Sequence, residues 1–181
     1  GLYQHFSSIA GNADLPIILY NVPSRTSVNM DPETVVRLAK IQNIVGIKEA
    51  SGSLQAISKI INDCGKDFTV LSGDDPLLWP ILAIGGQGVI SVTANILPTK
   101  VAAMYKAAAN GNIKDARSLH YELMDINETL FIDTNPVPVK AALHLMGKIE
   151  SELREPLVSL SSDHLEKLKK VMASYGLPAI K

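Results

Sequence analysis

Four short apolar runs, each followed by an amphipathic helical pattern, constrain the fold of this 181-residue chain more than any other feature. The runs cover residues 15–20, 45–49, 68–73 and 88–92. Polar and apolar residues alternate little in these runs, unlike in a half-exposed strand. This pattern favours parallel strands that are buried on both faces of a sheet. Repeated strand–helix units predict parallel strands joined by right-handed crossovers. A barrel of eight such units typically needs about 250 residues, so this chain holds roughly half of one.

The helical segments between these runs carry their own start and stop signals. Asp31 and Asp75 each precede a proline, which favours a helix start with the acid as its cap. Ser53 precedes a pattern of apolar residues at helical spacing that Gly65 ends. In the helix after the fourth run, the spacing predicts that Val101, Met104 and Tyr105 point inward.

Residues 112–181 show no strand pattern and are expected to form three helices. We therefore divide the chain into residues 1–111, a half barrel that carries a candidate catalytic lysine, and residues 112–181, a helical region. The predicted fold class is α/β, with four βα units followed by three helices.

Composition and charge exclude several classes of protein. The chain is 46% apolar with a formal net charge of -1, which is ordinary for a soluble globular protein and lacks the positive footprint of nucleic-acid binding. No run approaches the roughly 18 apolar residues of a membrane span, and the first residues do not resemble a signal peptide. Cys64 is the only cysteine, expected to pack rather than react, and a single thiol fits a reducing compartment. We therefore predict a cytoplasmic protein that binds neither nucleic acid nor membrane.

Lys48 stands at the end of the second run, where a barrel strand reaches the rim that carries chemistry. One interpretation is a side chain whose apolar stem packs while its ammonium reaches water. The other is a desolvated, neutral amine that attacks a keto acid and forms a Schiff base. Strand alternation turns Glu49 to the opposite face, so we do not expect Glu49 to act as the base.

Two residues near the end of the first run bear on the choice between these two interpretations of Lys48. Tyr20 ends the preceding strand, so its side chain and that of Lys48 could face one mouth. A tyrosine there could simply pack with its hydroxyl at the wet edge, or it could carry protons. Arg25, in the loop that follows, is either an ordinary exposed arginine or a bidentate partner for a substrate carboxylate.

Other polar groups are explained without invoking a site. Asp74 and Asp75 could together bind a hard cation, but Asp75 is expected to cap a helix and no histidine accompanies it. The glycine-rich segment 85–88 follows a helix and opens a strand, the reverse of a phosphate-binding loop, so it is a turn. The four histidines show no ligand spacing. The sequence therefore predicts no metal site.

Two segments carry a resemblance to a known family. They are residues 20–26 (YNVPSRT) and residues 46–52 (GIKEASG). In this order and spacing they resemble the dihydrodipicolinate synthase family of the pyruvate-dependent class I aldolases. The resemblance continues through residues 71–75, 88–92 and 135–140 and covers essentially the whole chain.

The resemblance implies a (β/α)8 TIM barrel, of which this chain corresponds to the fifth strand onward. It implies that Lys48 forms a Schiff base with pyruvate and that Tyr20 relays protons beside it. Arg25 matches the arginine that receives the carboxylate of the incoming aldehyde. Gly73 and Ile90 match pocket positions beside the bound pyruvate. No cofactor is implied, because a covalent lysine imine holds the pyruvate.

The implied enzyme is a lyase that condenses pyruvate with L-aspartate 4-semialdehyde to give 4-hydroxy-tetrahydrodipicolinate, in lysine and diaminopimelate biosynthesis. Its implied partners are these two small molecules and further copies of itself, since the family usually forms homotetramers. The family's first four βα units have no counterpart in this chain, so we expect a fragment that is inactive alone.

Two alternatives stay open. N-acetylneuraminate lyase, or another pyruvate aldolase, resembles the chain in the tyrosine and lysine motifs, but the lyase typically lacks an arginine at the position of Arg25 and differs around residues 72–74. The other alternative is a non-catalytic half barrel that binds or associates through its open sheet edges.

Overall fold

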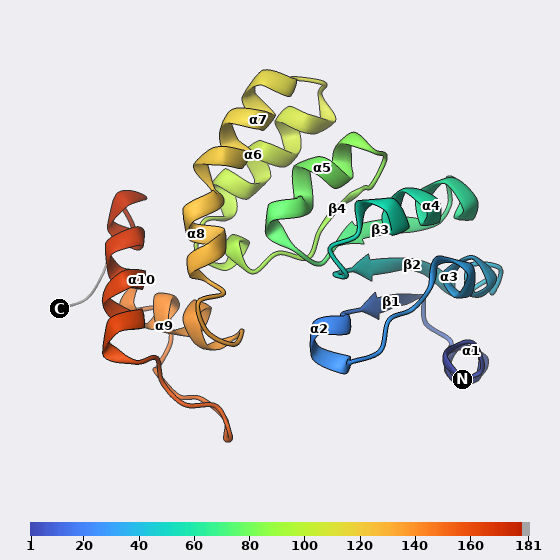
Figure 1. The fold of residues 1–181 in the computed structure, drawn as a ribbon, viewed down its shortest axis with the longest axis horizontal. Coiled ribbons are helices and arrows are strands. Elements are labelled where there is room, and N and C mark those ends of the chain that lie inside the picture. The colour runs from blue at the N-terminus through green and yellow to red at the C-terminus, as the bar shows by residue number, and fades with distance from the viewer. Residues whose placement is uncertain (179–181) are drawn as a thin grey trace. The chain divides into compact units, whose positions relative to one another are not determined.

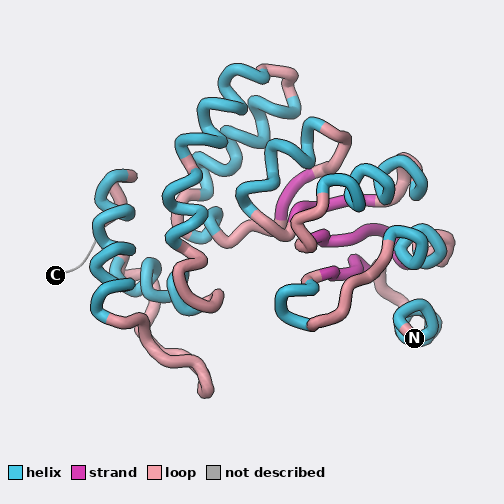
Figure 2. Tube along the Cα trace, viewed as in Figure 1, coloured by secondary structure: helices cyan, strands magenta, loops and turns pink. Residues whose placement is uncertain are grey.

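The computed structural model of the protein describes residues 1–178 and shows one parallel sheet with helices (Figures 1 and 2). The four strands follow one another in the order β1-β2-β3-β4 and every neighbouring pair is parallel. Their bounds are β1 Ile17–Asn21, β2 Ile44–Glu49, β3 Thr69–Ser72 and β4 Gly88–Val89. The α/β class and its four parallel strands are thus confirmed.

The fourth strand is shorter than its apolar run. Only Gly88 and Val89 pair with β3. The backbone N–H of Ile90 still donates to the carbonyl of Ser72 at 2.9 Å, and the chain then turns away. Residues 91 and 92 therefore leave the sheet, although the run to which they belong is typical of a strand.

Contacts between Cα atoms divide the chain into two compact units, Gly1–Ser91 and Val92 onward, each described here by itself. The division at residue 111 drawn from the strand–helix alternation stays a prediction. The helices of the first unit are α1 Leu2–Gly11, α2 Pro23–Thr26, α3 Pro32–Leu38, α4 Leu54–Cys64, the 3-10 helix η1 Asp75–Leu77 and α5 Leu78–Ala83.

The local signals place most of these helix ends correctly. At the start of α4, the Ser53 hydroxyl accepts a hydrogen bond from the N–H of Ala56 at 3.2 Å, as a capping serine does. Gly65 follows the helix with a φ of 81°, a conformation that costs glycine little. Asp31 occupies the cap position of α3, but its side chain makes no capping hydrogen bond.

The expectation that Asp75 caps a helix was wrong. Asp74 is the cap residue of η1, and Asp75 lies inside that turn with only 4% of its surface exposed. Its carboxylate accepts a hydrogen bond from the Ser91 hydroxyl. A buried carboxylate needs such a partner, and here a residue from beyond β4 supplies it.

The sheet of the first unit has one covered face and one open face. On the covered face, Leu19, Ile47 and Val70 are at most 1% exposed and pack with residues of α3, α4 and α5. In Figure 1, α4 lies next to β3, and α3 lies near the right-hand end of β2. We define the open face by the residues of opposite alternation, namely Ile18, Tyr20, Lys48, Leu71 and Ile90.

The described residues of the second unit form helices joined by loops and no strand. Its elements are η2 Thr93–Asn95, α6 Pro98–Ala109, α7 Ile113–Glu122, α8 Met124–Thr129, α9 Val137–Leu145 and α10 Ser162–Ser174. The first of the three expected C-terminal helices is interrupted at Leu123, which ends α7 and precedes α8. The N–H of Leu123 still bonds to Leu119 and that of Asn127 to Leu123, so the break is a single turn residue.

Two sequence expectations on this unit have different outcomes. Val101 and Met104 are buried, as expected for the inner face of α6. Tyr105 was expected to point inward, but 41% of its surface is exposed. It lies four residues past Val101 but about 100° further round the helix than Met104, at the edge of the inner face, where the packing around it leaves it partly exposed. Among the helices of residues 1–178, none has the length and apolar character that a membrane crossing requires.

Candidate active site

Tyr20 and Lys48 occupy matching positions at the carboxyl ends of β1 and β2. The two residues are register partners across the parallel pair, and both side chains lie on the open face. The Nζ atom of Lys48 lies 4.1 Å from the centroid of the Tyr20 ring, within the range of a cation–π contact. The side chain of Lys48 is partly buried, whereas Tyr20 is 45% exposed. The structure therefore brings together the two residues on which the predicted chemistry depends.

Gly73 joins this pair from the next strand. Its N–H donates to the carbonyl of Glu49 at 2.7 Å, which continues the hydrogen bonding just beyond the ends of β2 and β3. A Cβ atom at this position would lie 2.7 Å from Cβ of Ala50 and 3.1 Å from Cε of Lys48. The first distance is shorter than atoms allow, so only glycine fits against the lysine stem without displacement.

Arg25 lies in α2, the single helical turn that follows β1. Its side chain is exposed, and within residues 1–178 its guanidinium takes part in no ion pair or side-chain hydrogen bond. We call residues 22–30 the Arg25 loop. A cavity of about 110 Å³ is lined by Leu2, Phe6, Tyr20 and Asn21 together with four residues of this loop other than Arg25, namely Val22, Thr26, Val28 and Met30. The Arg25 guanidinium, on the loop that begins shortly after Tyr20, is therefore not paired with a carboxylate of residues 1–178.

Ile90 follows β4 and contributes an apolar side chain to the open face. It is 46% exposed, as is Ile18 on β1 at the same value. The open face therefore combines an amine and a phenol with apolar neighbours, which is the composition of a pocket lining.

The sequence interpretation missed a buried polar network directly behind Tyr20 and Lys48. Asn21 and Glu49 are register partners on the covered face, and they are 3% and 1% exposed. The Asn21 Nδ2 atom lies 2.9 Å from Glu49 Oε2, and the N–H of Ser51 donates to Glu49 Oε1 at 2.6 Å. The position of Glu49 away from Lys48 confirms the expectation from alternation. A signal for the network was present, because an acid predicted to face a covered surface needs a partner.

Two titratable groups of the first unit lie outside this arrangement. Burial, and then the charge of Asp75, raises the pKa of Asp74. Burial raises the pKa of the Cys64 thiol to about 11, which suits a packing residue rather than a nucleophile. In the part of the chain that the structure describes, no three or more His, Cys, Asp or Glu side chains gather as a metal site would require.

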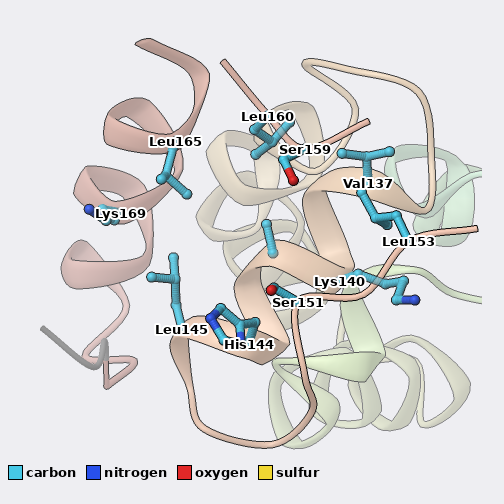
Figure 3. A pocket seen from close by; sticks show the side chains of 11 residues that line it. Val137, Lys140, His144, Leu145, Ser151, Leu153, Ser159, Leu160, Leu165 and Lys169 are labelled. Carbon is cyan, nitrogen blue, oxygen red and sulfur yellow. The ribbon is translucent and has the colours of Figure 1, made fainter. Parts of the chain in front are cut away.

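A larger cavity, of about 380 Å³, lies within the second unit between α9, α10 and the segment 151–160 (Figure 3). Two of its cations are already engaged, since Lys140 donates to the carbonyl of Glu152 and Lys169 pairs with Glu166 at 2.8 Å. The remaining lining is mainly apolar, with Val137, Ala141, Leu145, Leu153, Leu160 and Leu165. None of the site residues predicted from the sequence belongs to this cavity.

Comparison with known proteins gives a consistent result. Residues 1–175 match the dihydrodipicolinate synthetase family. A 4-hydroxy-tetrahydrodipicolinate synthase from Syntrophus aciditrophicus is 54% identical over 177 residues, which are 98% of this chain and 61% of the relative. The chain thus spans about three fifths of the length of the curated relatives it matches.

Solved structures agree with the sequence match. The crystal structure of dihydrodipicolinate synthase from Aquifex aeolicus superposes with a TM-score of 0.98 at 44% identity, covering 100% of this chain and 62% of that one. The chloride-inhibited enzyme from Acinetobacter baumannii, solved in complex with pyruvate, superposes with a TM-score of 0.94 at 41% identity over 98% of this chain and 61% of that one. These likenesses support the expectation of a partial TIM barrel. The chain therefore belongs to the dihydrodipicolinate synthetase family.

Proposed function

We propose that the protein containing this chain is a lyase that condenses pyruvate with L-aspartate 4-semialdehyde to give 4-hydroxy-tetrahydrodipicolinate. The observation that carries the proposal is the contact of Lys48 with Tyr20 at the carboxyl ends of adjacent strands, in a chain of this family. The carboxyl-terminal rim is where barrel enzymes hold their reacting groups. Because the chain spans 61% of its relative, the activity is proposed for the complete gene product.

The first half of the proposed reaction takes place at Lys48. Its neutral amine attacks the keto carbon of pyruvate, and loss of water gives an imine. The methyl group of the bound pyruvate then loses a proton and the imine becomes an enamine. Tyr20, whose ring lies against the lysine, carries protons to and from the reacting atoms. Gly73, where only glycine fits against the lysine stem, and the apolar side chain of Ile90 lie beside the bound pyruvate in this scheme.

The second half joins the two substrates. The enamine carbon attacks the aldehyde carbon of L-aspartate 4-semialdehyde, forming the new carbon–carbon bond, and the aldehyde oxygen takes up a proton. Arg25 holds the carboxylate of this second substrate through its planar guanidinium. The substrate's own amine then attacks the imine carbon, which closes the ring and releases Lys48. The covalent imine takes the place of a cofactor in this scheme.

The Arg25 position also bears on the choice between related enzymes. A free guanidinium on the loop after β1 suits an aldehyde substrate that itself carries a carboxylate, and it favours the synthase over an N-acetylneuraminate lyase-like reaction. We further propose that the complete protein acts as a homo-oligomer on small molecules in the cytoplasm.

Trapping with pyruvate and borohydride tests the proposal. Borohydride reduces the imine, so we expect the complete gene product to gain the mass of one reduced pyruvate, located on the Lys48 peptide. Lys48→Arg keeps the positive charge but cannot form an imine and is expected to abolish labelling, whereas Lys66→Arg, at an exposed position of the same unit, should leave it intact. Labelling of another lysine, or no labelling, would contradict the proposed function and favour a non-catalytic half barrel.

A further inference from the structure

We propose that Asn21 and Glu49 are positioning residues for Arg25. Their side chains fasten both ends of the Arg25 loop to the carboxyl end of β2, the strand that carries Lys48. We call this pair the Asn21–Glu49 clamp. The expected effect of the clamp on substrate binding rests on the proposed function, whereas its expected effect on the stability of the loop does not.

The Asn21 amide closes the base of the loop. Asn21 itself precedes the loop, and its Oδ1 accepts a hydrogen bond from the N–H of Met30, the last loop residue, at 3.0 Å. Its Nδ2 lies 3.0 Å from Oδ1 of Asn29. One side chain therefore holds the two ends of a nine-residue segment together, counting 22 to 30.

Glu49 ties this closed base to β2. Asn21 Nδ2 lies 2.9 Å and 3.2 Å from the two carboxylate oxygens, and the Ser51 N–H donates to the same carboxylate at 2.6 Å. Within residues 1–178 the carboxylate has no ion-pair partner, so neutral donors alone compensate its burial. Such a group is costly to bury and is held only where its hydrogen bonds are satisfied.

The loop itself requires external support. Ser27 has a φ of 56°, a left-handed conformation that is uncommon for a residue other than glycine. Conformations of this kind persist where the surroundings impose them. The helical turn that carries Arg25 ends at Ser27, whose N–H bonds to the carbonyl of Pro23 at 2.9 Å. The position of the guanidinium thus depends on a strained turn whose base the clamp closes.

Amide hydrogen exchange tests the effect on the loop without any substrate. In Asn21→Ala, we expect the N–H groups of Thr26 and Ser27, which do not bond to Asn21, to exchange about tenfold faster. Glu49→Gln keeps the shape and one acceptor oxygen, so it should raise these rates less. Asn43→Ala is the matched control, because Asn43 likewise uses its Nδ2 as a donor, here to two backbone carbonyls at 2.9 Å each, but precedes β2 at its other end. Unchanged Thr26 and Ser27 rates in Asn21→Ala would overturn the proposal.

Kinetics of the complete gene product test the link to Arg25. In Asn21→Ala we expect the KM for the aldehyde substrate to rise about tenfold while the KM for pyruvate and the trapping of pyruvate stay within about twofold. In an Arg25→Ala background the same change should add little to the aldehyde KM, because a residue that acts through Arg25 has nothing left to position. Additive effects, or an equal rise in both KM values, would overturn the positioning role.

The exchange experiment and the pyruvate trapping together distinguish a failure of the clamp proposal from a failure of the proposed function. If the unchanged protein traps no pyruvate, the proposed function is wrong, and the exchange rates still decide whether the clamp holds the loop. If pyruvate is trapped but the loop amides do not respond to Asn21→Ala, the function stands and the clamp is wrong. Glu49→Gln provides the same readout should Asn21→Ala fail to fold.

Discussion

The two faces of the four-stranded sheet use their polar groups in opposite ways. On the covered face, Asn21 and Glu49 direct their hydrogen bonds to each other, to Asn29 and to nearby backbone, and almost no surface of either is exposed. On the open face, their immediate neighbours Tyr20 and Lys48 contact each other and keep exposed surface. Because side chains alternate along a strand, a single residue step separates the two roles.

Because of this difference, we expect substitutions on the two faces to have different effects. A change on the open face should alter chemistry and leave unfolding nearly unaffected, since those side chains bury little. A change on the covered face should first cost stability, since it leaves a buried polar group without its partner. Substitutions at adjacent positions therefore test whether the two faces differ in this way.

The largest effect is expected for Tyr20→Phe on the open face. Loss of the hydroxyl removes the proposed proton carrier, so kcat of the complete gene product should fall about hundredfold or more. The ring that contacts Lys48 is retained, so the midpoint of thermal unfolding should stay the same. Steady-state rates and a thermal melt measure the two. Full activity would show that the phenol carries no proton, and a large drop in melting temperature would show that the open face is structural.

Asn21→Leu, one residue further on, should mainly cost stability. It leaves the buried Glu49 carboxylate without its side-chain donor, so we expect the free energy of unfolding to fall by about 2–4 kcal/mol in urea titrations. Asn12→Leu is the control, because Asn12 is exposed and donates only to the carbonyl of Ser8. Its cost should stay within about 0.5 kcal/mol. Equal costs at the two asparagines would remove the distinction between the faces.

Gly73→Ala should affect both stability and chemistry, because Gly73 lies where the lysine stem meets the backbone. The added methyl group would lie too close to Ala50 and press on Lys48, and such overpacking costs about 1–3 kcal/mol. We also expect a lower yield of borohydride-trapped pyruvate. Gly11→Ala, where an added Cβ meets no atom within 4 Å, should leave trapping unchanged. Trapping at the level of the unchanged protein would show that the lysine stem has room to move.

The smallest effect is expected for Asp74→Asn. The pKa of Asp74 is raised, chiefly by burial and then by Asp75, so the folded state disfavours the ionised carboxylate. For an acid with a raised pKa, the folded protein loses stability as the pH rises through that pKa. Asp74→Asn should therefore raise the free energy of unfolding slightly at neutral pH, and this gain should vanish below the pKa of a free aspartate, about 3.9. Urea titrations at both pH values measure it, and a loss of stability at neutral pH would contradict the assigned cause.

The local signals identified most elements, and the deviations share one cause. Ser53 and Gly65 correctly marked the ends of α4, because capping depends on adjacent residues. Asp75 was assigned the same local role, but its carboxylate instead bonds to Ser91, sixteen residues away. Tyr105 had the right spacing for the inner face of α6 but lies at its edge. Each deviation depends on what packs against the residue, which periodicity does not specify.

The amino-acid pattern was sufficient to predict the parallel strand–helix alternation, the placement of Tyr20 and Lys48 at strand ends, and the orientation of Glu49 to the opposite face. These follow from the backbone periods of two residues in a strand and 3.6 in a helix. The three-dimensional packing was needed to show that Asn21 is the partner of Glu49, that Nζ of Lys48 lies over the Tyr20 ring, and that Gly73 lies against the lysine stem. Those contacts depend on the register between strands distant in the sequence, and register is set by the packing of the whole sheet.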